Sequence, residues 1–243
     1  MKRVSTIVPV YNEEKCIERT FDEVVKYCFL HPEYDFIFVN DGSEDSTKEI
    51  ILQKINSLGM QSQITLISYE NNYGKGYAVR YGVKYSTGDY VCFIDADLAY
   101  SLEHLNHLAE KLDIFDVVIG SRPLDDIGVK NQNILRKISG KIFNLLSRKI
   151  LNLHFNDMQA GLKGFRLQVA KQLFQKQVLT GFAFDVELIY IARKYGYYIG
   201  EIPAKISESH LLKKSKVNLI KDSIFMFYNL LQIRINDWKK LYE

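Results

Sequence analysis

In its first 120 residues the chain alternates short apolar runs with segments of helical spacing. The apolar runs are residues 5–10, 36–39, 64–69, 90–94 and 117–119. The helical segments between them are residues 17–30, 46–58, 75–85 and 102–112. Continuous apolar strands separated by helices are typical of a parallel sheet that is covered on both faces. We therefore predict an α/β fold with a parallel sheet.

Composition excludes several other classes of protein. A chain of 243 residues with 47% hydrophobic and 13% aromatic residues and a net charge of only +3 can bury a core, so it is not disordered. Three widely spaced cysteines, Cys16, Cys28 and Cys92, predict neither a disulfide framework nor a zinc site, and they favour a reducing compartment. Because no run of 18 apolar residues occurs, no membrane-spanning helix or secretion signal is expected.

Polar residues follow the predicted strands. In open α/β sheets ligands bind beyond the carboxyl ends of the strands. Carboxylates lie there after three strands, and Arg122 follows a fourth. Neither G-x-G-x-x-G after the first strand nor G-x-x-x-x-G-K-[ST] is present, which argues against a dehydrogenase or a P-loop kinase. This pattern favours a metal-assisted site for an anionic ligand.

Asp95 and Asp97 are the strongest chemical signal. Residues two apart after a strand point to the same side, and the small Ala96 between them permits close approach. Paired carboxylates suit Mg²⁺ or Mn²⁺, which keep open positions for substrate phosphates. The alternative is a pair of solvated turn residues that cap the next helix.

Other acidic residues have both structural and functional interpretations. Asp41 is placed to accept hydrogen bonds from a ribose or base, but Asp-Gly is also a turn signal. Asp157 could serve as a base or hydrogen-bond a turn. Glu187 could serve as a base, or it could supply favourable charge near a helix start.

The motifs resemble glycosyltransferase family 2, whose members have the GT-A fold. The resemblance implies a Rossmann-like, mostly parallel sheet flanked by helices. The resemblance rests on Val-Pro-Val-Tyr-Asn-Glu-Glu at 8–14, Val-Asn-Asp-Gly-Ser at 39–43, Gly-Lys-Gly at 74–76 and Asp-Ala-Asp at 95–97. The stretches at 120–122, 157–165 and 184–187 are similar to the polyprenyl-phosphate branch, meaning dolichyl-phosphate β-glucosyltransferases and dolichol-phosphate mannose synthases. The match runs from about residue 5 to about residue 216.

The resemblance implies a set of roles for these residues. The nucleotide-sugar would be held by Pro9, Tyr11, Glu13, Val39, Asp41, Asp95, Ala96, Asp97, Arg122 and Lys216. Asp95 and Asp97 would carry Mg²⁺ or Mn²⁺ on the diphosphate. Asp157, Arg122 and Glu187 would be the catalytic residues. Many relatives have a glutamine soon after the second aspartate, whereas Leu98 follows here, which removes an expected third metal ligand.

A basic amphipathic segment spans residues 128–156, with six Lys or Arg and no Asp or Glu. Its apolar residues fall on one half of a helical wheel and most basic residues on the other, as in a helix on anionic lipid. An ordinary core-packed helix is the alternative, and nucleic acid is not expected because no reader motif is present. The resemblance implies that this segment faces the bilayer and that Arg136 and Ser139 receive the acceptor phosphate.

Residues 217–243 are predicted to form a C-terminal hydrophobic and basic helix beside the main domain, residues 1–216. Because the helix is apolar on most sides, it should be buried in protein, in a homodimer or membrane-protein partner, or in a membrane surface. We expect a cytoplasmic protein that lies peripherally on the cytosolic face of a membrane.

Three functions remain open at this point. The leading one is inverting, metal-dependent transfer of glucose from UDP-glucose to a polyprenyl phosphate, and mannosyl transfer from GDP-mannose is its variant. The second is a family 2 glycosyltransferase that acts on a hydroxyl acceptor in surface polysaccharide or glycolipid synthesis. A hydroxyl acceptor would need Asp157 or Glu187 as a base, whereas a phosphate monoester, with a second pKa of about 6, would not. A non-catalytic nucleotide-sugar binder is the third.

Overall fold

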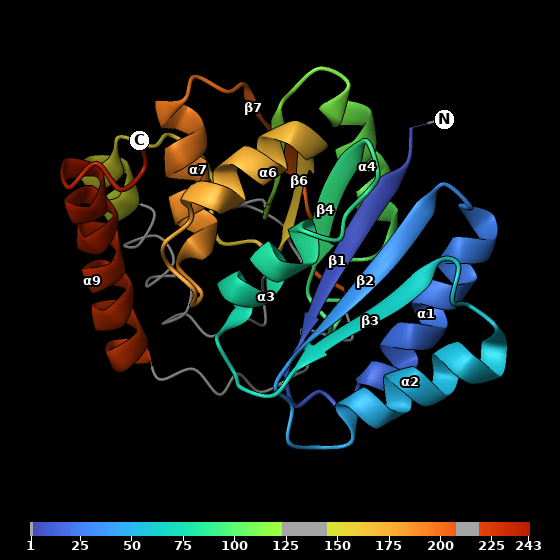
Figure 1. The fold of residues 1–243 in the computed structure, drawn as a ribbon. Helices are drawn as coiled ribbons and strands as arrows, with labels where there is room; N and C mark the ends of the chain where they lie inside the picture. Colours follow the sequence, from blue (N-terminus) through green and yellow to red (C-terminus); the bar gives the residue numbers. More distant parts are fainter. Residues whose placement is uncertain (1, 123–144, 208–218) are drawn as a thin grey trace.

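The protein is built around a seven-stranded sheet with the strand order β3-β2-β1-β4-β6-β5-β7 (Figure 1). The computed structural model describes residues 2–122, 145–207 and 219–243. All strands run parallel except β6, which is antiparallel to both β4 and β5. The predicted α/β class with a mostly parallel sheet is confirmed. The elements are β1 Val4–Val10, α1 Ile17–Leu30, β2 Tyr34–Asp41, α2 Thr47–Leu58, β3 Ile64–Tyr69, α3 Lys75–Val83, β4 Tyr90–Ile94, α4 Glu103–Leu112, β5 Val117–Ser121, β6 Leu162–Arg166, α6 Leu167–Lys176, α7 Phe184–Lys194, β7 Ile199–Pro203 and α9 Leu219–Trp238.

Helices cover both faces of the sheet. On one face α1, α2 and α4 enclose a core with Phe21, Phe38 and Leu105. On the other face α3, α6 and α7 enclose a second core with Phe93 and Phe184. The continuous apolar runs arise because β1, β2 and β4 are buried on both faces.

The antiparallel strand β6 and the edge strand β7 were not predicted from the sequence. Lys163 and Gly164 interrupt the apolar pattern of β6, but both serve packing. Lys163 is fully buried and paired with an aspartate, and a Cβ on Gly164 would meet Leu112 Cδ1 at 3.0 Å, so its bare backbone lets α4 approach closely. β7, at the sheet edge, alternates fully buried positions with half-buried or exposed ones because successive side chains point to opposite faces of the sheet.

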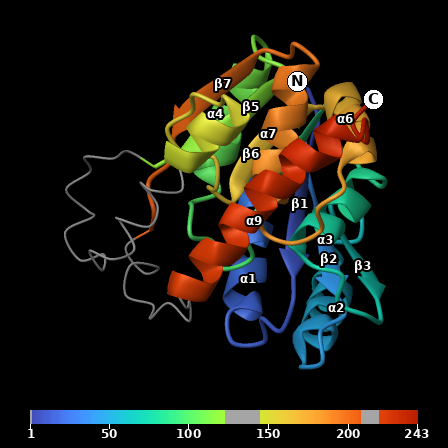
Figure 2. The ribbon, with the colours of Figure 1, turned by 90° about the vertical axis from the view of Figure 1, so that its left-hand side faces the viewer.

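Helix α9 lies on the outer side of α7 (Figures 1 and 2). Its Leu230 and Ile233 are fully buried in the second core. Tyr190 of α7 donates a hydrogen bond to Asp237, and Lys194 lies 2.5 Å from the same carboxylate. Within the described part of the chain, no helix is both long and apolar enough to span a bilayer.

Candidate active site

The loops that follow β1 and β2 are joined to each other at the carboxyl edge of the sheet. The Asn12 N–H donates to Ser43 Oγ at 3.0 Å, and the Glu44 N–H donates to Asn12 Oδ1 at 2.8 Å. The Glu13 N–H donates to Thr47 Oγ1 at 2.8 Å. These bonds hold the first loop so that Tyr11 is 42% exposed at the edge.

The predicted nucleotide contacts in these loops have different surroundings. Pro9 is half-buried, and the Glu13 carboxylate accepts a hydrogen bond from the Cys16 thiol at 2.9 Å. Val39 is fully buried in the core, so its side chain is not presented to a ligand. Asp41 is buried and accepts the N–H groups of Tyr73 and Gly74 at 2.8 and 2.9 Å, so it holds the loop that leads into α3.

Asp95 and Asp97 lie in a tight turn directly after β4. The Leu98 N–H donates to the Asp95 carbonyl at 3.1 Å, and Leu98 has a φ of 48°, in the left-handed region. The buried Thr20 hydroxyl donates to the Ala96 carbonyl at 2.5 Å, which fixes the turn against α1. Both carboxylates are partly exposed, and Asp97 Oδ1 also accepts the Ala99 N–H.

Lys75, at the start of α3, is the cation that faces these carboxylates. Its Nζ lies 2.5 Å from Asp95 Oδ1. Burial lowers the pKa of Lys75, but the carboxylates of Asp95 and Asp185 more than offset burial, so the pKa lies above its ordinary value. Lys75 is therefore a charged ammonium. Sequence reasoning did not select Lys75 as a site residue, although Gly-Lys-Gly at 74–76 is one of the motifs on which the family resemblance rests.

A second buried ion pair lies beside the first. Lys163 Nζ is 2.7 Å from Asp185 Oδ1 and donates to the Ala160 carbonyl at 2.7 Å. Burial lowers the pKa of Lys163 and raises the pKa of Asp185, so each depends on the other for its charge. A Cβ on Gly161 would overlap the Asp95 carboxylate, and glycine at this position gives that carboxylate its room.

Arg122 and Asp157 form a third pair at the end of β5. The guanidinium is bidentate: Nε contacts Oδ2, and Nη2 donates to Oδ1 at 3.0 Å. Asp157 also accepts the Gln159 N–H at 3.0 Å. Burial raises the pKa of Asp157, but Arg122 outweighs burial and holds that pKa below its usual range. Asp157 is thus a fixed carboxylate, and it is poorly suited to removing a proton at neutral pH.

The three pairs form one charged cluster. The charge of Asp95 helps to raise the pKa of Arg122, after the larger effect of Asp157. Tyr100 is buried beside the cluster. Burial raises the pKa of its hydroxyl, the charge of Arg122 lowers that pKa, and the charges of Asp157 and Asp95 raise it. Residues that the sequence placed after separate strands are therefore neighbours in space.

Glu187 lies apart from the three ion pairs and has its own hydrogen-bond partners. It is fully buried, its oxygens accept the N–H groups of Val178 and Leu179, and it accepts the Tyr242 hydroxyl. These contacts favour a structural role over the predicted catalytic one. Asp185, two residues earlier on α7, is the carboxylate of this helix that faces Lys75 and Asp95.

The predicted phosphate contacts Arg136, Ser139 and Lys216 lie outside the described residues.

The Asp95–Asp97 turn fits a divalent cation. Among the described residues no three His, Cys, Asp or Glu side chains are arranged to hold a metal. Mg²⁺, however, is commonly bound by one or two carboxylates together with substrate phosphates. Asp95 pairs with the ammonium of Lys75 through Oδ1, its Oδ2 lies against the bare backbone of Gly161, and both Asp95 and Asp97 are partly exposed, so the two carboxylates are the residues that would hold such a cation.

Comparison with known proteins gives matches over nearly the whole chain. Residues 5–174 match the model of glycosyl transferase family 2. A dolichyl-phosphate beta-glucosyltransferase of Trichomonas vaginalis is 32% identical over 96% of this chain and 72% of its own length. One of Dictyostelium discoideum is 31% identical over 95% of this chain and 73% of its own. Glucosyl-3-phosphoglycerate synthase from Mycobacterium tuberculosis, solved with Mn²⁺ and UDP-glucose, has a TM-score of 0.66 at 14% identity and covers 97% of this chain and 78% of its own. This structural likeness confirms the predicted GT-A fold.

Proposed function

Since this chain belongs to glycosyltransferase family 2, we propose that it transfers glucose from UDP-glucose to a polyprenyl phosphate. The observation that carries the proposal is the identity of 31–32%, over almost the whole chain, to relatives named dolichyl-phosphate beta-glucosyltransferase. UDP-glucose and Mn²⁺ are bound by a protein of the same fold. The site supplies the charges that this reaction needs.

On the donor side, Asp95 and Asp97 would hold Mg²⁺ or Mn²⁺. A divalent cation there supplies Lewis-acid stabilisation of the negative charge on the departing diphosphate. Lys75, held beside the same carboxylates, adds a fixed positive charge near the diphosphate. Tyr11, in the loop after β1, and Asp41, the last residue of β2, would contact the nucleoside.

On the acceptor side, the locked Asp157 favours a nucleophile that needs no base. A phosphate monoester has a second pKa of about 6 and is mostly a dianion at neutral pH. Its oxygen can attack the anomeric carbon while the bond from that carbon to UDP breaks, which inverts the configuration. Arg122, with its side chain 37% exposed, neutralises phosphate charge, and Asp157 holds the guanidinium in place.

The same geometry weighs against a hydroxyl acceptor. A sugar hydroxyl must lose its proton in the transition state, which requires a carboxylate of suitable pKa within reach. Asp157 is held as an ion pair with Arg122, and Glu187 accepts three hydrogen bonds inside the protein. GDP-mannose remains the alternative donor.

A donor and acceptor screen tests the proposal. The protein is incubated with labelled UDP-glucose or GDP-mannose, polyprenyl phosphate in detergent, and Mg²⁺ or Mn²⁺. We expect lipid-soluble label from UDP-glucose only, loss of label with a chelator, and a roughly hundredfold lower rate for Asp97→Asn. Asp113→Asn, beside Lys2 at the opposite end of β4, is the matched control. Label from GDP-mannose alone would reassign the sugar, and no lipid-soluble label from either donor would reject the proposal.

We also propose that the protein binds peripherally to the cytosolic face of a membrane. Among residues 227–238, the part of helix α9 whose side chains the structure describes, five exposed apolar side chains lie within about 100° of the helix circumference. They are Phe227, Tyr228, Leu231, Ile235 and Trp238. Exposed Arg234, Lys239 and Lys240 lie near this stripe, and a basic-flanked apolar face fits an anionic lipid surface. A second copy of the chain is the alternative occupant.

A further inference from the structure

Glu187 is a buried carboxylate that the proposed reaction does not use. Its Oε1 accepts the Val178 N–H at 3.1 Å and its Oε2 accepts the Leu179 N–H at 2.9 Å. Oε1 also accepts the Tyr242 hydroxyl at 2.7 Å. A buried carboxylate with three donors is firmly placed, because losing any donor would leave charge poorly compensated. Glu187 therefore fixes the backbone of the loop that joins α6 to α7.

That loop in turn holds the start of α3. The Thr180 carbonyl accepts the Gly76 N–H at 2.7 Å and the Tyr77 N–H at 3.3 Å. The first N–H groups of a helix have no partner within the helix, so the loop satisfies two of them. Lys75, the cation that pairs with Asp95, lies directly before these two residues.

The contact between this loop and α3 leaves no free space. A Cβ on Gly74 would meet the Thr180 carbonyl oxygen at 2.7 Å. A Cβ on Gly76 would meet Phe184 Cβ at 2.7 Å and Gln177 Nε2 at 2.8 Å. Both glycines that flank Lys75 are thus pressed against residues 177–184. A shift of the loop must move the backbone of Lys75.

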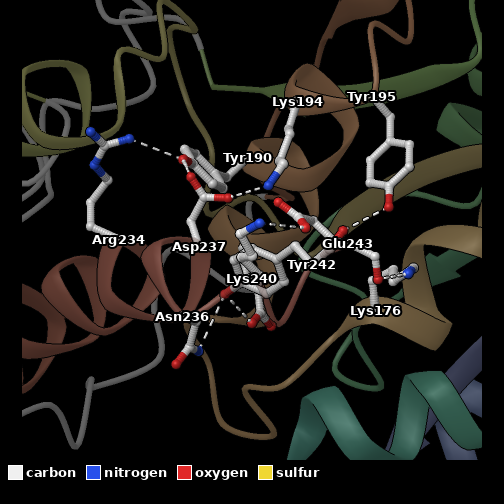
Figure 3. A network of polar contacts seen from close by, with 11 residues as sticks. Lys176, Tyr190, Lys194, Tyr195, Arg234, Asn236, Asp237, Lys240, Tyr242 and Glu243 are labelled. Carbon is white, nitrogen blue, oxygen red and sulfur yellow. Dashed lines mark hydrogen bonds and ion pairs between the residues drawn. The ribbon is translucent and has the colours of Figure 1, made fainter.

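Tyr242 holds Glu187 from the other side. Its ring is fully buried, its hydroxyl also accepts a hydrogen bond from Asn236 Nδ2 at 3.3 Å, and its carbonyl accepts the Tyr195 hydroxyl at 2.6 Å. Figure 3 shows Tyr242 beside Asn236 and Tyr195, in the polar network that joins the end of α9 to α7. The segment after α9 is therefore tied, through one carboxylate, to the loop beside the active site.

We propose that Glu187 is a positioning residue for Lys75, acting through the Val178–Thr180 backbone, and that Tyr242 holds Glu187 in place. The role at Lys75 rests on the proposed function, because that function makes Lys75 part of the donor site. This assignment also accounts for glycine on both sides of Lys75, since only a bare backbone fits against the loop.

Two substitutions separate positioning from stability. Glu187→Gln replaces one acceptor oxygen with an N–H₂ group that faces backbone donors, so the loop should shift. Tyr242→Phe removes only the hydroxyl and should act in the same direction but more weakly. Tyr190→Phe is the matched control: it removes a hydroxyl that joins α7 to α9 through Asp237 and does not contact Glu187.

The first measurement is the acetylation rate of Lys75 by an amine reagent, followed by mass spectrometry, which requires no donor. The Lys75 side chain is only 14% exposed and ion-paired, so its acetylation is slow in the unaltered protein. We expect the rate to rise about fivefold or more in Glu187→Gln, less in Tyr242→Phe, and not in Tyr190→Phe. The second measurement is the kinetics with UDP-glucose, in which Glu187→Gln should raise KM about tenfold or more, with a smaller change in kcat.

The outcomes are distinguishable. If Glu187→Gln lowers only the melting temperature, as Tyr190→Phe should, while Lys75 acetylation and KM stay unchanged, the inference is wrong. If Glu187→Gln does not fold, Tyr242→Phe decides by the same two measurements. If the unaltered protein neither binds nor uses UDP-glucose, the proposed function fails, and the Lys75 acetylation rate alone then decides whether Glu187 positions this lysine.

Discussion

Asp157 and Arg122 are the residues whose pairing most directly distinguishes the acceptor classes. If Asp157 only holds Arg122, Asp157→Asn should lower kcat about tenfold, because the guanidinium loses its fixed orientation. Loss of a general base would lower kcat by about 10²- to 10⁴-fold. Steady-state kinetics with polyprenyl phosphate as the acceptor distinguish the positioning role of Asp157 from a general-base role. A fall of about 10²-fold or more, in a variant that is still folded under the assay conditions, would contradict the positioning role.

The same pair predicts a pH dependence of stability. Because the folded pKa of Asp157 lies below its ordinary value, its contribution to stability is present above pH ~4 and is lost as pH falls through the folded pKa. Asp157→Asn should lower the free energy of unfolding by about 2–3 kcal/mol at pH 7, since one partner of a mostly buried pair is removed. Urea titrations at several pH values should show this difference shrink below pH ~4. A difference that stays constant down to pH 2 would contradict this prediction.

Gly161 gives a prediction for the cation site. In Gly161→Ala the new methyl group would overlap the Asp95 carboxylate, which must turn away from its present position. We expect Mn²⁺ affinity in the presence of UDP-glucose to fall at least tenfold, measured by electron paramagnetic resonance. Gly181→Ala is the matched control, because a Cβ there meets nothing within 4 Å. Equal Mn²⁺ affinity in the two variants would show that Asp95 does not hold the cation.

At the scale of elements, the Lys163–Asp185 pair joins β6 to α7. Lys163→Met should lower the free energy of unfolding by about 3–5 kcal/mol, because it leaves a buried aspartate without its cation. The double variant Lys163→Met with Asp185→Leu should recover much of that loss, since no uncompensated charge remains. Urea unfolding of the single and double variants measures the coupling. Additive losses would mean that the two side chains do not act as a pair.

This pair also shows what could be read from the sequence. Strands β1 to β5 were predictable because each contains an apolar run, and the position of Asp95, Asp97 and Arg122 at the edge of the sheet was predictable because each follows such a run. Strand β6 was not, because a buried lysine looks like a surface residue until its partner, 22 positions away in the sequence, is known. For the same reason Glu187 was chosen over Asp185: only the packing of α7 shows which carboxylate faces Lys75.

At the scale of the whole molecule, α9 offers a spectroscopic test of membrane binding. Trp238 is the only tryptophan of the chain, and it is 84% exposed at the end of the apolar stripe. If this stripe enters a bilayer surface, tryptophan emission should shift to shorter wavelength with anionic vesicles. The shift should be smaller with neutral vesicles or in high salt, because basic residues near the stripe contribute attraction that salt screens.

A charge placed in the stripe should weaken this binding. Burying one leucine side chain contributes about 1.5–3 kcal/mol, so Leu231→Glu should weaken vesicle partitioning at least tenfold in a co-sedimentation assay. Leu58→Glu, at a similarly exposed position on α2, is the matched control and should leave partitioning unchanged. If the stripe is instead covered by a second copy of the chain, Trp238 emission will depend on protein concentration and not on vesicles. In that case Leu231→Glu will change the molecular mass in solution, and the membrane proposal for α9 will be wrong.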